Sequence, residues 1–122
     1  MRAAPRYAEK DVLASVRKAL KALGVFHLRM NTGKAKFQGK GKTYYVDYGF
    51  PGMADLLAFP HSHARSQPVP LWIETKASDS TQKSEQKMFQ RIVEQEGHYY
   101  VCVRSAAELI EWLRNLQLTE PS

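Results

Sequence analysis

Apolar residues recur at helical spacing in three stretches of the chain. The first covers residues 8–23 and stops before Gly24, a residue typical of helix C-termini. The second lies within residues 78–97 and the third follows Ser105, where Ser105 and Glu108 have capping-box spacing, and runs to about Leu116. The residues expected on the buried faces of these helices are Val12, Leu13, Val16, Leu20, Leu23, Phe89, Ile92, Val93, Leu109, Ile110, Leu113 and Leu116.

Five shorter runs of apolar, aromatic and β-branched residues predict strands. They cover residues 25–30, 44–50, 53–59, 71–77 and 98–103. A Pro-Gly turn at Pro51 and Gly52 separates the second from the third, and a proline- and serine-rich stretch is expected to join the third to the fourth as a hairpin loop. The resulting order, α-β-β-β-β-α-β-α, predicts an α/β fold in which helices flank one mixed β-sheet, within a single domain spanning residues 1–122.

Composition narrows the class of protein. The 122 residues carry 18 basic and 12 acidic side chains, a net charge of +6 that favours a polyanionic partner such as nucleic acid. One cysteine excludes an internal disulfide framework, which is typical of a reducing compartment. No apolar run approaches the roughly 20 residues of a membrane-spanning helix, and the N-terminus lacks the apolar core of a secretory signal. We therefore expect an intracellular protein.

Between the first two predicted strands, residues 34–43 read KAKFQGKGKT and are expected to form a loop. Its lysines are Lys34, Lys36, Lys40 and Lys42. Two interpretations stay open for this stretch: a solvated loop without a partner, or a basic loop that grips DNA phosphates. The nearby tyrosines Tyr44, Tyr45 and Tyr48 are expected to pack in the sheet rather than to stack on bases.

Two of the apolar runs are interrupted by charged residues. Asp55 lies at the start of the third predicted strand, and Glu74 and Lys76 lie at the end of the fourth. Because alternate residues of a strand share a face, Glu74 and Lys76 point to the same side, and a hairpin can bring Asp55 beside Glu74. Two carboxylates so close repel each other unless a cation lies between them. A buried ion pair of Lys76 with either acid is the structural alternative, although such pairs stabilise a small domain poorly.

The segments GMAD and IETK, joined by the predicted hairpin, resemble the Asp…Glu-X-Lys signature of the restriction-endonuclease-like nuclease superfamily, also written PD-(D/E)XK. The segment that follows, SDSTQKSEQKMFQRIVEQEGHYYVCVRS, is similar to the C-terminal half of the virus-type replication-repair nuclease (VRR-NUC) domain. The resemblance covers roughly residues 6–115. It departs from the family pattern at Ala54, where a proline is common, and at Ser105, which replaces the second arginine of Val-Arg-Arg.

The resemblance implies a role for each matching residue. Asp55 and Glu74 would bind Mg²⁺ or Mn²⁺ together with the backbone carbonyl of Thr75, and Lys76 would be the catalytic lysine. Gln86 would be the helix glutamine near the site, with Gln82 as the alternative. Glu9 matches an acid of the first helix that can reach the metal, although an ordinary first-turn acid explains it equally well.

Together these features predict a metal-dependent, structure-specific DNA endonuclease. The resemblance further implies a stand-alone protein of bacterial or phage-infected cytoplasm. We expect it to act as a homodimer that resolves four-way junctions, because a two-fold dimer supplies two active sites for two symmetric nicks. The dimer interface is expected in residues 43–50 or on the last helix, around Trp112. The alternatives are a flap or sequence-tolerant repair nuclease, a DNA-binding module of the same fold that does not cut, a sequence-specific restriction enzyme, and an unrelated α/β enzyme whose acids serve another metal reaction.

Overall fold

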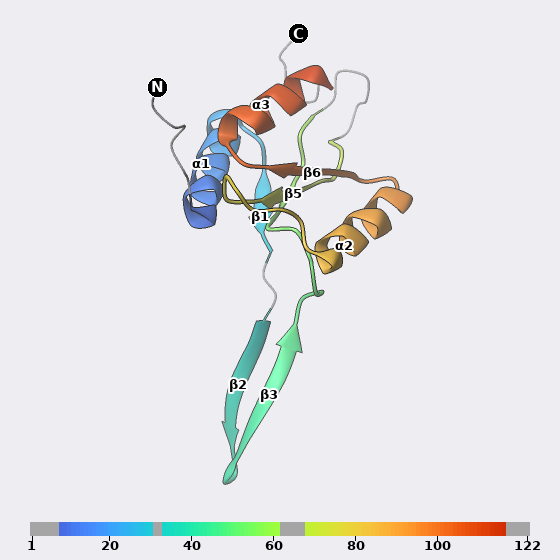
Figure 1. Ribbon diagram of the computed structural model, residues 1–122. Coiled ribbons are helices and arrows are strands. Elements are labelled where there is room, and N and C mark those ends of the chain that lie inside the picture. The colour runs from blue at the N-terminus through green and yellow to red at the C-terminus, as the bar shows by residue number, and fades with distance from the viewer. Residues whose placement is uncertain (1–7, 31–32, 62–67, 117–122) are drawn as a thin grey trace.

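The computed structural model describes residues 8–30, 33–61 and 68–116 of the 122-residue chain (Figure 1). Three helices and six strands make up this part. In chain order they are α1 (Glu9–Ala22), β1 (His27–Arg29), β2 (Gly33–Gly39), β3 (Lys42–Tyr48), β4 (Leu56–Ala58), β5 (Leu71–Thr75), α2 (Ser84–Gln95), β6 (Tyr99–Val103) and α3 (Ala106–Asn115). No helix in these residues is long and apolar enough to cross a membrane.

The body of the molecule is a four-stranded mixed sheet in the order β1-β4-β5-β6. The pairs β1–β4 and β4–β5 are antiparallel, and β5–β6 is parallel. A parallel pair cannot be joined by a tight turn, so α2 forms the crossover between β5 and β6. The α/β class and the mixed sheet predicted from the sequence are confirmed.

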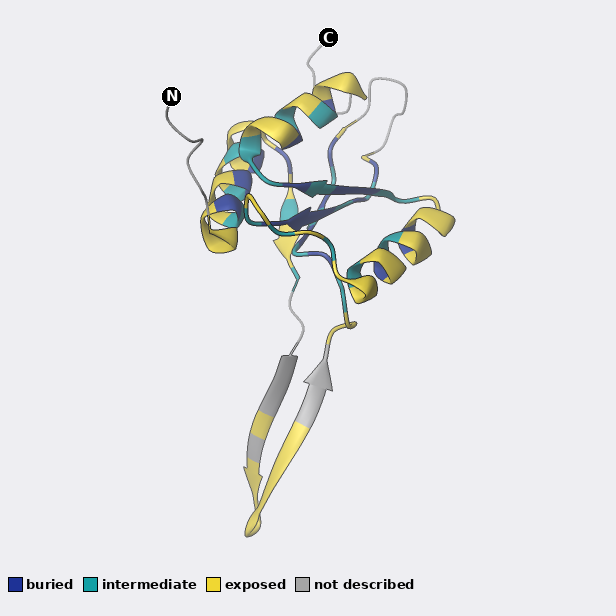
Figure 2. Cartoon of the chain, viewed as in Figure 1, coloured by how far each residue is buried: buried dark blue, intermediate teal, exposed yellow. Residues whose placement is uncertain are grey.

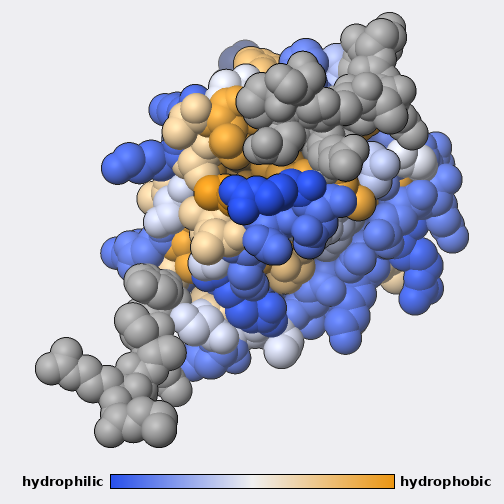
Figure 3. Space-filling model, turned by 90° about the horizontal axis from the view of Figure 1, so that it is seen from above, coloured by the Kyte–Doolittle hydropathy of each residue, from blue (hydrophilic) through white to orange (hydrophobic). Residues whose placement is uncertain are grey.

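Helices cover both faces of this sheet, as the alternation of residues along its strands requires (Figures 1 and 2). On one face, α1 and α3 bury a cluster that includes Leu20 and Leu109 against Leu71 and Ile73 of β5. On the other face, α2 packs through Phe89 and Val93 on Tyr100, with Trp72 at the edge of this cluster. The face that carries α3, seen from above, is mostly polar, with small apolar patches between the hydrophilic residues (Figure 3).

The predicted order of elements was wrong at one place. Residues 33–39, expected to be part of a loop, form strand β2, which pairs with β3 as an antiparallel hairpin around the two-residue connection Lys40-Gly41. This ribbon belongs to no larger sheet and projects away from the body (Figure 1). The observed order is therefore α-β-β-β-β-β-α-β-α, and residues 44–50 do not enter the central sheet. The predicted strand of residues 53–59 is likewise shorter, so that Asp55 precedes β4.

Several expected core positions also differ. Tyr44 and Tyr45, predicted to pack in the sheet, are 53% and 65% exposed because the ribbon has no layer beneath it. Ile92 and Leu116 are also exposed, since their helices turn these positions away from the sheet. Trp112 is half-buried, with its ring edge-on to Tyr99. The capping box was correct for Ser105, whose hydroxyl accepts from the Glu108 amide, but the Glu108 carboxylate accepts from the Arg104 amide instead of the Ser105 amide.

Candidate metal centre

The antiparallel pairing of β4 and β5 brings Asp55 to Glu74. Leu56 pairs with Ile73 in an antiparallel register, so Asp55, one residue before Leu56, meets Glu74, one residue after Ile73. Thr75 then holds the Asp55 carboxylate: its backbone N–H and its hydroxyl both donate to Oδ2, at 2.7 and 2.8 Å. The Asp55 backbone carbonyl accepts from the Met30 amide at 2.8 Å. Asp55 is thus fixed although it lies outside a regular strand.

The turn before Asp55 is fixed by α2. The Met53 amide donates to the Phe50 carbonyl at 2.9 Å, which closes the turn predicted at Pro51-Gly52. Gly52 has a φ of +80°, and its Cα lies so close to the first turn of α2 that an added Cβ would collide with the backbone carbonyl of Glu85. Only glycine satisfies both conditions, and its contact holds the segment that leads to Asp55 against the helix that carries Gln86.

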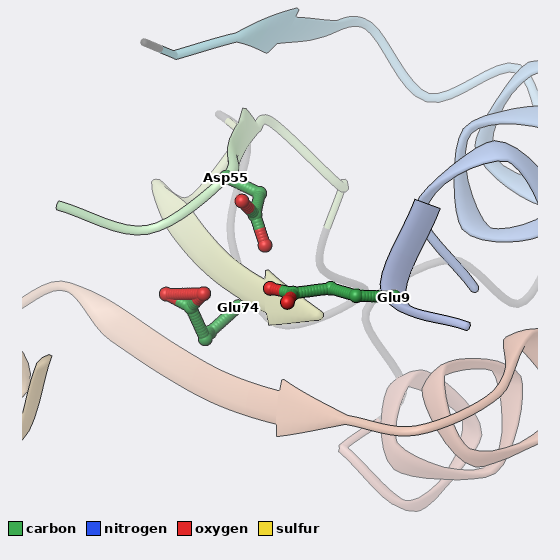
Figure 4. A group of neighbouring side chains, drawn as sticks. All are labelled: Glu9, Asp55 and Glu74. Carbon is green, nitrogen blue, oxygen red and sulfur yellow. The ribbon is translucent and has the colours of Figure 1, made fainter. Parts of the chain in front are cut away.

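A third carboxylate reaches the same place from α1. Glu9 lies in the first turn of that helix, and its side chain points toward Asp55 and Glu74 (Figure 4). One carboxylate oxygen from each of the three residues lies within 4.8 Å of the others. Glu9 lies in α1, Asp55 directly before β4, and Glu74 in β5. Only the packing of α1 on the sheet therefore brings Glu9 to the other two acids.

Glu74 is the most buried member of this acid cluster, with 2% of its surface exposed. Its Oε1 accepts a hydrogen bond from Gln86 Nε2 at 3.3 Å, whereas its Oε2 is buried without a hydrogen-bond partner among the described residues. Burial, and next the negative charge of Asp55, raise the pKa of Glu74 to about 9, while the positive charge of Lys76 acts in the opposite direction. Without a cation in the cluster, Glu74 is therefore protonated at neutral pH.

Lys76 and Gln86 both lie next to Glu74. Lys76 follows β5 directly, is buried, and donates its backbone N–H to the Val103 carbonyl at 3.0 Å. The described residues contain no ion pair between Lys76 and either strand acid, which disfavours the alternative of a buried structural pair. Gln86 also accepts from the Lys83 amide at 2.8 Å, so it caps α2 while it touches Glu74. Gln82 instead donates to Gln90 and Tyr100.

Arg29 at the end of β1 was not predicted as a site residue. Its Nη1 donates to the backbone carbonyls of Asp55, at 3.1 Å, and Met30, and lies 3.8 Å from Asp55 Oδ1. No local pattern in the sequence indicates this contact, because β1 and β4 are neighbours in the sheet but are separated in the chain by the ribbon. Among the residues the structure describes, Arg29 is the cation that pairs with the negative charge of Asp55.

Two groups of exposed basic residues lie outside the acid cluster, on the ribbon and on α2. Lys36, Lys40 and Lys42 are exposed on the projecting ribbon, and the side chain of Lys34 lies outside the described set. A second group, which sequence reasoning missed, is the row Lys83, Lys87 and Arg91, exposed at four-residue spacing along α2. The lysines predicted to bind DNA are therefore separate from the acids.

The donor set fits a hard divalent cation. Such ions take oxygen ligands and are often held by one or two carboxylates, and this cluster offers three. Oε2 of an ionised Glu74 has no hydrogen-bond partner among the described residues, so a cation would satisfy it. Without a cation, the protonated Glu74 can share its proton with the neighbouring Asp55 carboxylate. The three acids could thus hold a metal ion. The Thr75 carbonyl stays a predicted ligand, while the Thr75 amide and hydroxyl bind Asp55.

Comparison with known proteins assigns no family. No protein-family model, curated protein or solved structure matches this chain. Any functional interpretation therefore depends on the chemistry of the acid cluster and on the surfaces around it.

Proposed function

We propose that the protein is a metal-dependent deoxyribonuclease of the VRR-NUC type within the PD-(D/E)XK superfamily. The observation that supports it most is the acid cluster itself: Glu9, Asp55 and Glu74 converge from three segments of the chain, and one oxygen of the buried Glu74 has no partner among the described residues. Lys76, buried directly after β5, is near enough to Glu74 for its positive charge to lower the pKa of that carboxyl. Holding three carboxyl groups this close is electrostatically costly unless a cation lies among them or one of them stays protonated.

In this proposal the three acids hold Mg²⁺ or Mn²⁺. A divalent cation supplies Lewis acidity that neutralises charge on a phosphate oxygen and makes water more acidic. Thr75 fixes the orientation of Asp55, and Gln86 fixes that of Glu74. Lys76 contributes a positive charge beside Glu74, where negative charge accumulates on the phosphate during hydrolysis.

The substrate is DNA, bound through its backbone by the exposed lysines of the β2–β3 ribbon. Because phosphate contacts carry no sequence information, the choice of substrate depends on DNA shape. The preferred substrate in this proposal is a four-way junction cut by a homodimer, and a flap is the alternative. Trp112, once expected at the interface, packs partly on Tyr99, so the exposed Tyr44 and Tyr45 are the better candidates for contact with a second copy or with DNA.

The direct test is cleavage of DNA by the pure protein with and without metal. We expect cutting with Mg²⁺ or Mn²⁺ and none with excess chelator. Glu9→Ala, Asp55→Ala and Glu74→Ala should each lose activity, whereas Glu111→Ala, which removes an exposed acid from α3, should not. Cutting that persists in chelator would exclude the mechanism. Tight DNA binding without cleavage under any metal would favour the binding-module alternative.

Substrate choice and assembly need a separate measurement. A gel assay should compare a four-way junction, a flap, plain duplex and single strand, and light scattering should give the mass in solution. A dimer that prefers the junction supports the proposed substrate. A monomer that cuts flaps best would support the flap alternative and leave the nuclease assignment intact.

A further inference from the structure

The ribbon of β2 and β3, here called the arm, has no structural role in the body of the protein. Its two strands pair with each other and with no strand of the central sheet, and Figure 1 shows it projecting beyond the layer of helices. An isolated two-stranded hairpin is at best marginally stable in water. A chain that extends such a hairpin into solvent, with Tyr44 and Tyr45 more than half exposed, has a surface suited to a partner.

The charge of the arm indicates which partner. Within residues 33–48 there are four lysines and one acid, Asp47. Lys36, Lys40 and Lys42 are exposed, and Lys36 pairs across the ribbon with the exposed Tyr45. A slender basic ribbon with exposed tyrosines matches a nucleic-acid groove, because the major groove of B-DNA admits a two-stranded β-ribbon and tyrosine hydroxyls bond phosphates.

The tip of the arm is shaped for close approach. Gly41 has a φ of +69°, and nothing lies within 4 Å of the place where its Cβ would be. Near the tip, the ring of Tyr44 lies so close to Gly39 that a Cβ added there would displace the ring. The tip is therefore narrow, and it carries Lys40 and Lys42 on either side of Gly41.

We propose that the arm lies along a groove of the duplex that flanks the scissile phosphate, so that the enzyme requires duplex DNA on that side. Each strand of the arm has seven residues, which at ~3.3 Å per residue gives a reach of about 23 Å. At a rise of ~3.4 Å per base pair this corresponds to at most roughly seven base pairs of DNA, because a groove runs obliquely to the duplex axis. This inference rests on the proposed function for the position of the cut, but it concerns binding and can be measured without cleavage.

The register of the ribbon allows the arm to be shortened cleanly. Ala35 and Val46 pair directly, so replacing residues 36–45 by Asn-Gly leaves a shorter hairpin with a favoured two-residue turn. Three register pairs remain, which reach roughly three base pairs by the same arithmetic. Because the arm pairs with no strand of the body, the shortened protein should keep the circular dichroism spectrum and thermal transition of the body.

The experiment measures binding in the Glu74→Gln background, which prevents cutting. The probes are fluorescent Y-shaped DNAs whose duplex part, closed by a loop, runs from about four to about fourteen base pairs. The affinity of the protein with the full arm should rise with duplex length and level off by about seven base pairs, whereas that of the shortened protein should level off at a shorter length, by about three. An equal plateau length for both proteins would overturn the inference.

Salt dependence gives a second readout. The triple change Lys36→Gln, Lys40→Gln, Lys42→Gln should flatten the slope of log K against log salt by about 2.7, at ~0.9 per phosphate contact. The matched control removes three exposed charges from α1 and α3, by Lys18→Gln, Lys21→Gln and Arg114→Gln, and should keep the parent's slope. If the shortened arm converts a dimer to a monomer without changing the slope, the arm binds a second copy of the chain and the groove proposal is wrong.

The two proposals fail separately. If the unmodified protein cuts no DNA with any metal but the plateau still moves with arm length, the nuclease proposal fails and the arm remains a duplex-binding element. If cleavage is normal and the plateau is insensitive to the arm, the arm inference fails and the nuclease proposal stands.

Discussion

One carboxylate oxygen of Asp55 accepts two hydrogen bonds from Thr75, one from its amide at 2.7 Å and one from its hydroxyl at 2.8 Å. The pair joins the residue before β4 to the last residue of β5, across the strands that carry the acid cluster. Thr75 is fully buried, so both bonds are shielded from competing water. This arrangement fixes one oxygen of Asp55 and leaves Oδ1 for Arg29 and for a ligand.

Removing the Thr75 hydroxyl should loosen the Asp55 carboxylate. Thr75→Val keeps the shape of the side chain and deletes one hydrogen bond to a charged group, so the free energy of unfolding should fall by about 1.5–3 kcal/mol. Metal affinity should fall as well, because the carboxylate is held by one bond fewer. Urea unfolding and metal titration measure the two effects. Thr75→Ser retains the hydroxyl and should stay close to the parent in metal affinity; an equal loss in both variants would mean that the hydroxyl does not orient Asp55.

The raised pKa of Glu74 predicts that the metal-free protein loses stability as the pH rises. Below about pH 4.5 Glu74 is protonated in both the folded and the unfolded chain. Between about 4.5 and about 9 the folded protein keeps a proton that the unfolded chain releases. Stability therefore falls through this window, by at most ~1.4 kcal/mol per pH unit, and levels off above it. Glu74→Gln should remove this contribution, which urea unfolding at several pH values can measure.

Metal binding should reverse this behaviour. A cation in the acid cluster favours the charged form of Glu74, so Mg²⁺ or Mn²⁺ binding near pH 7 should release about one proton and strengthen as the pH rises. Calorimetric titration in two buffers of different protonation enthalpy counts the protons released. In Glu74→Gln the enthalpy should no longer depend on the buffer. Binding that is tighter at pH 6 than at pH 8 would contradict the assignment of Glu74 as a ligand.

Lys76 should be needed for cleavage but not for metal binding. Lys76→Met keeps a long apolar stem in the buried position and removes the charge, so the fold and the affinity of the acids for metal should persist. The cleavage rate should fall by about 10²–10⁴, the usual range for a positioned proton-transfer or charge-stabilising group. Single-turnover cleavage and metal titration separate the two effects. Lys21→Met, on the exposed side of α1, is the matched control and should leave the rate unchanged.

Gly52→Ala should disturb the acid cluster from outside it. The added Cβ strains a backbone at φ +80° and also collides with the Glu85 carbonyl, so we expect a loss of more than about 1–3 kcal/mol, the range for backbone strain alone. Gly97→Ala provides the comparison, because Gly97 has a φ of +85° but open space around it. The difference between the two variants in urea unfolding isolates the contact of the turn with α2. Equal losses would mean that the turn can move away from α2 freely.

The sequence predicted the parts of this structure that depend on local pattern. Helix periodicity located α1, α2 and α3, and the apolar run of residues 71–77 located β5, which ends at Thr75, one residue before Lys76. The hairpin of β4 and β5 was sufficient to bring Asp55 beside Glu74. Each of these depends on residues near one another in the chain, where the periods of helix and strand govern burial.

The parts that were missed depend on packing or on weak strand signals. Residues 33–39 have two glycines and two lysines, and their strand forms only because β3 pairs with it, so the stretch lacks the apolar alternation of a sheet strand. The two-residue connection containing Gly41 was the available hairpin signal. Glu9 could not be distinguished from an ordinary first-turn acid, and Arg29 not from a surface cation, because tertiary contacts place both.

The arm also has a consequence for how the chain folds. It is inserted between β1 and β4, which pair directly through Arg29 and Leu56, so the central sheet can form only after a long loop has closed. The hairpin of β2 and β3 involves only near neighbours and can form first. Once formed, it draws Gly33 and Tyr48 together and shortens that loop by more than half. Each halving of a closed loop lowers its entropic cost by roughly 0.6 kcal/mol. The hairpin therefore offsets part of the loop-closure cost that its own insertion between β1 and β4 creates.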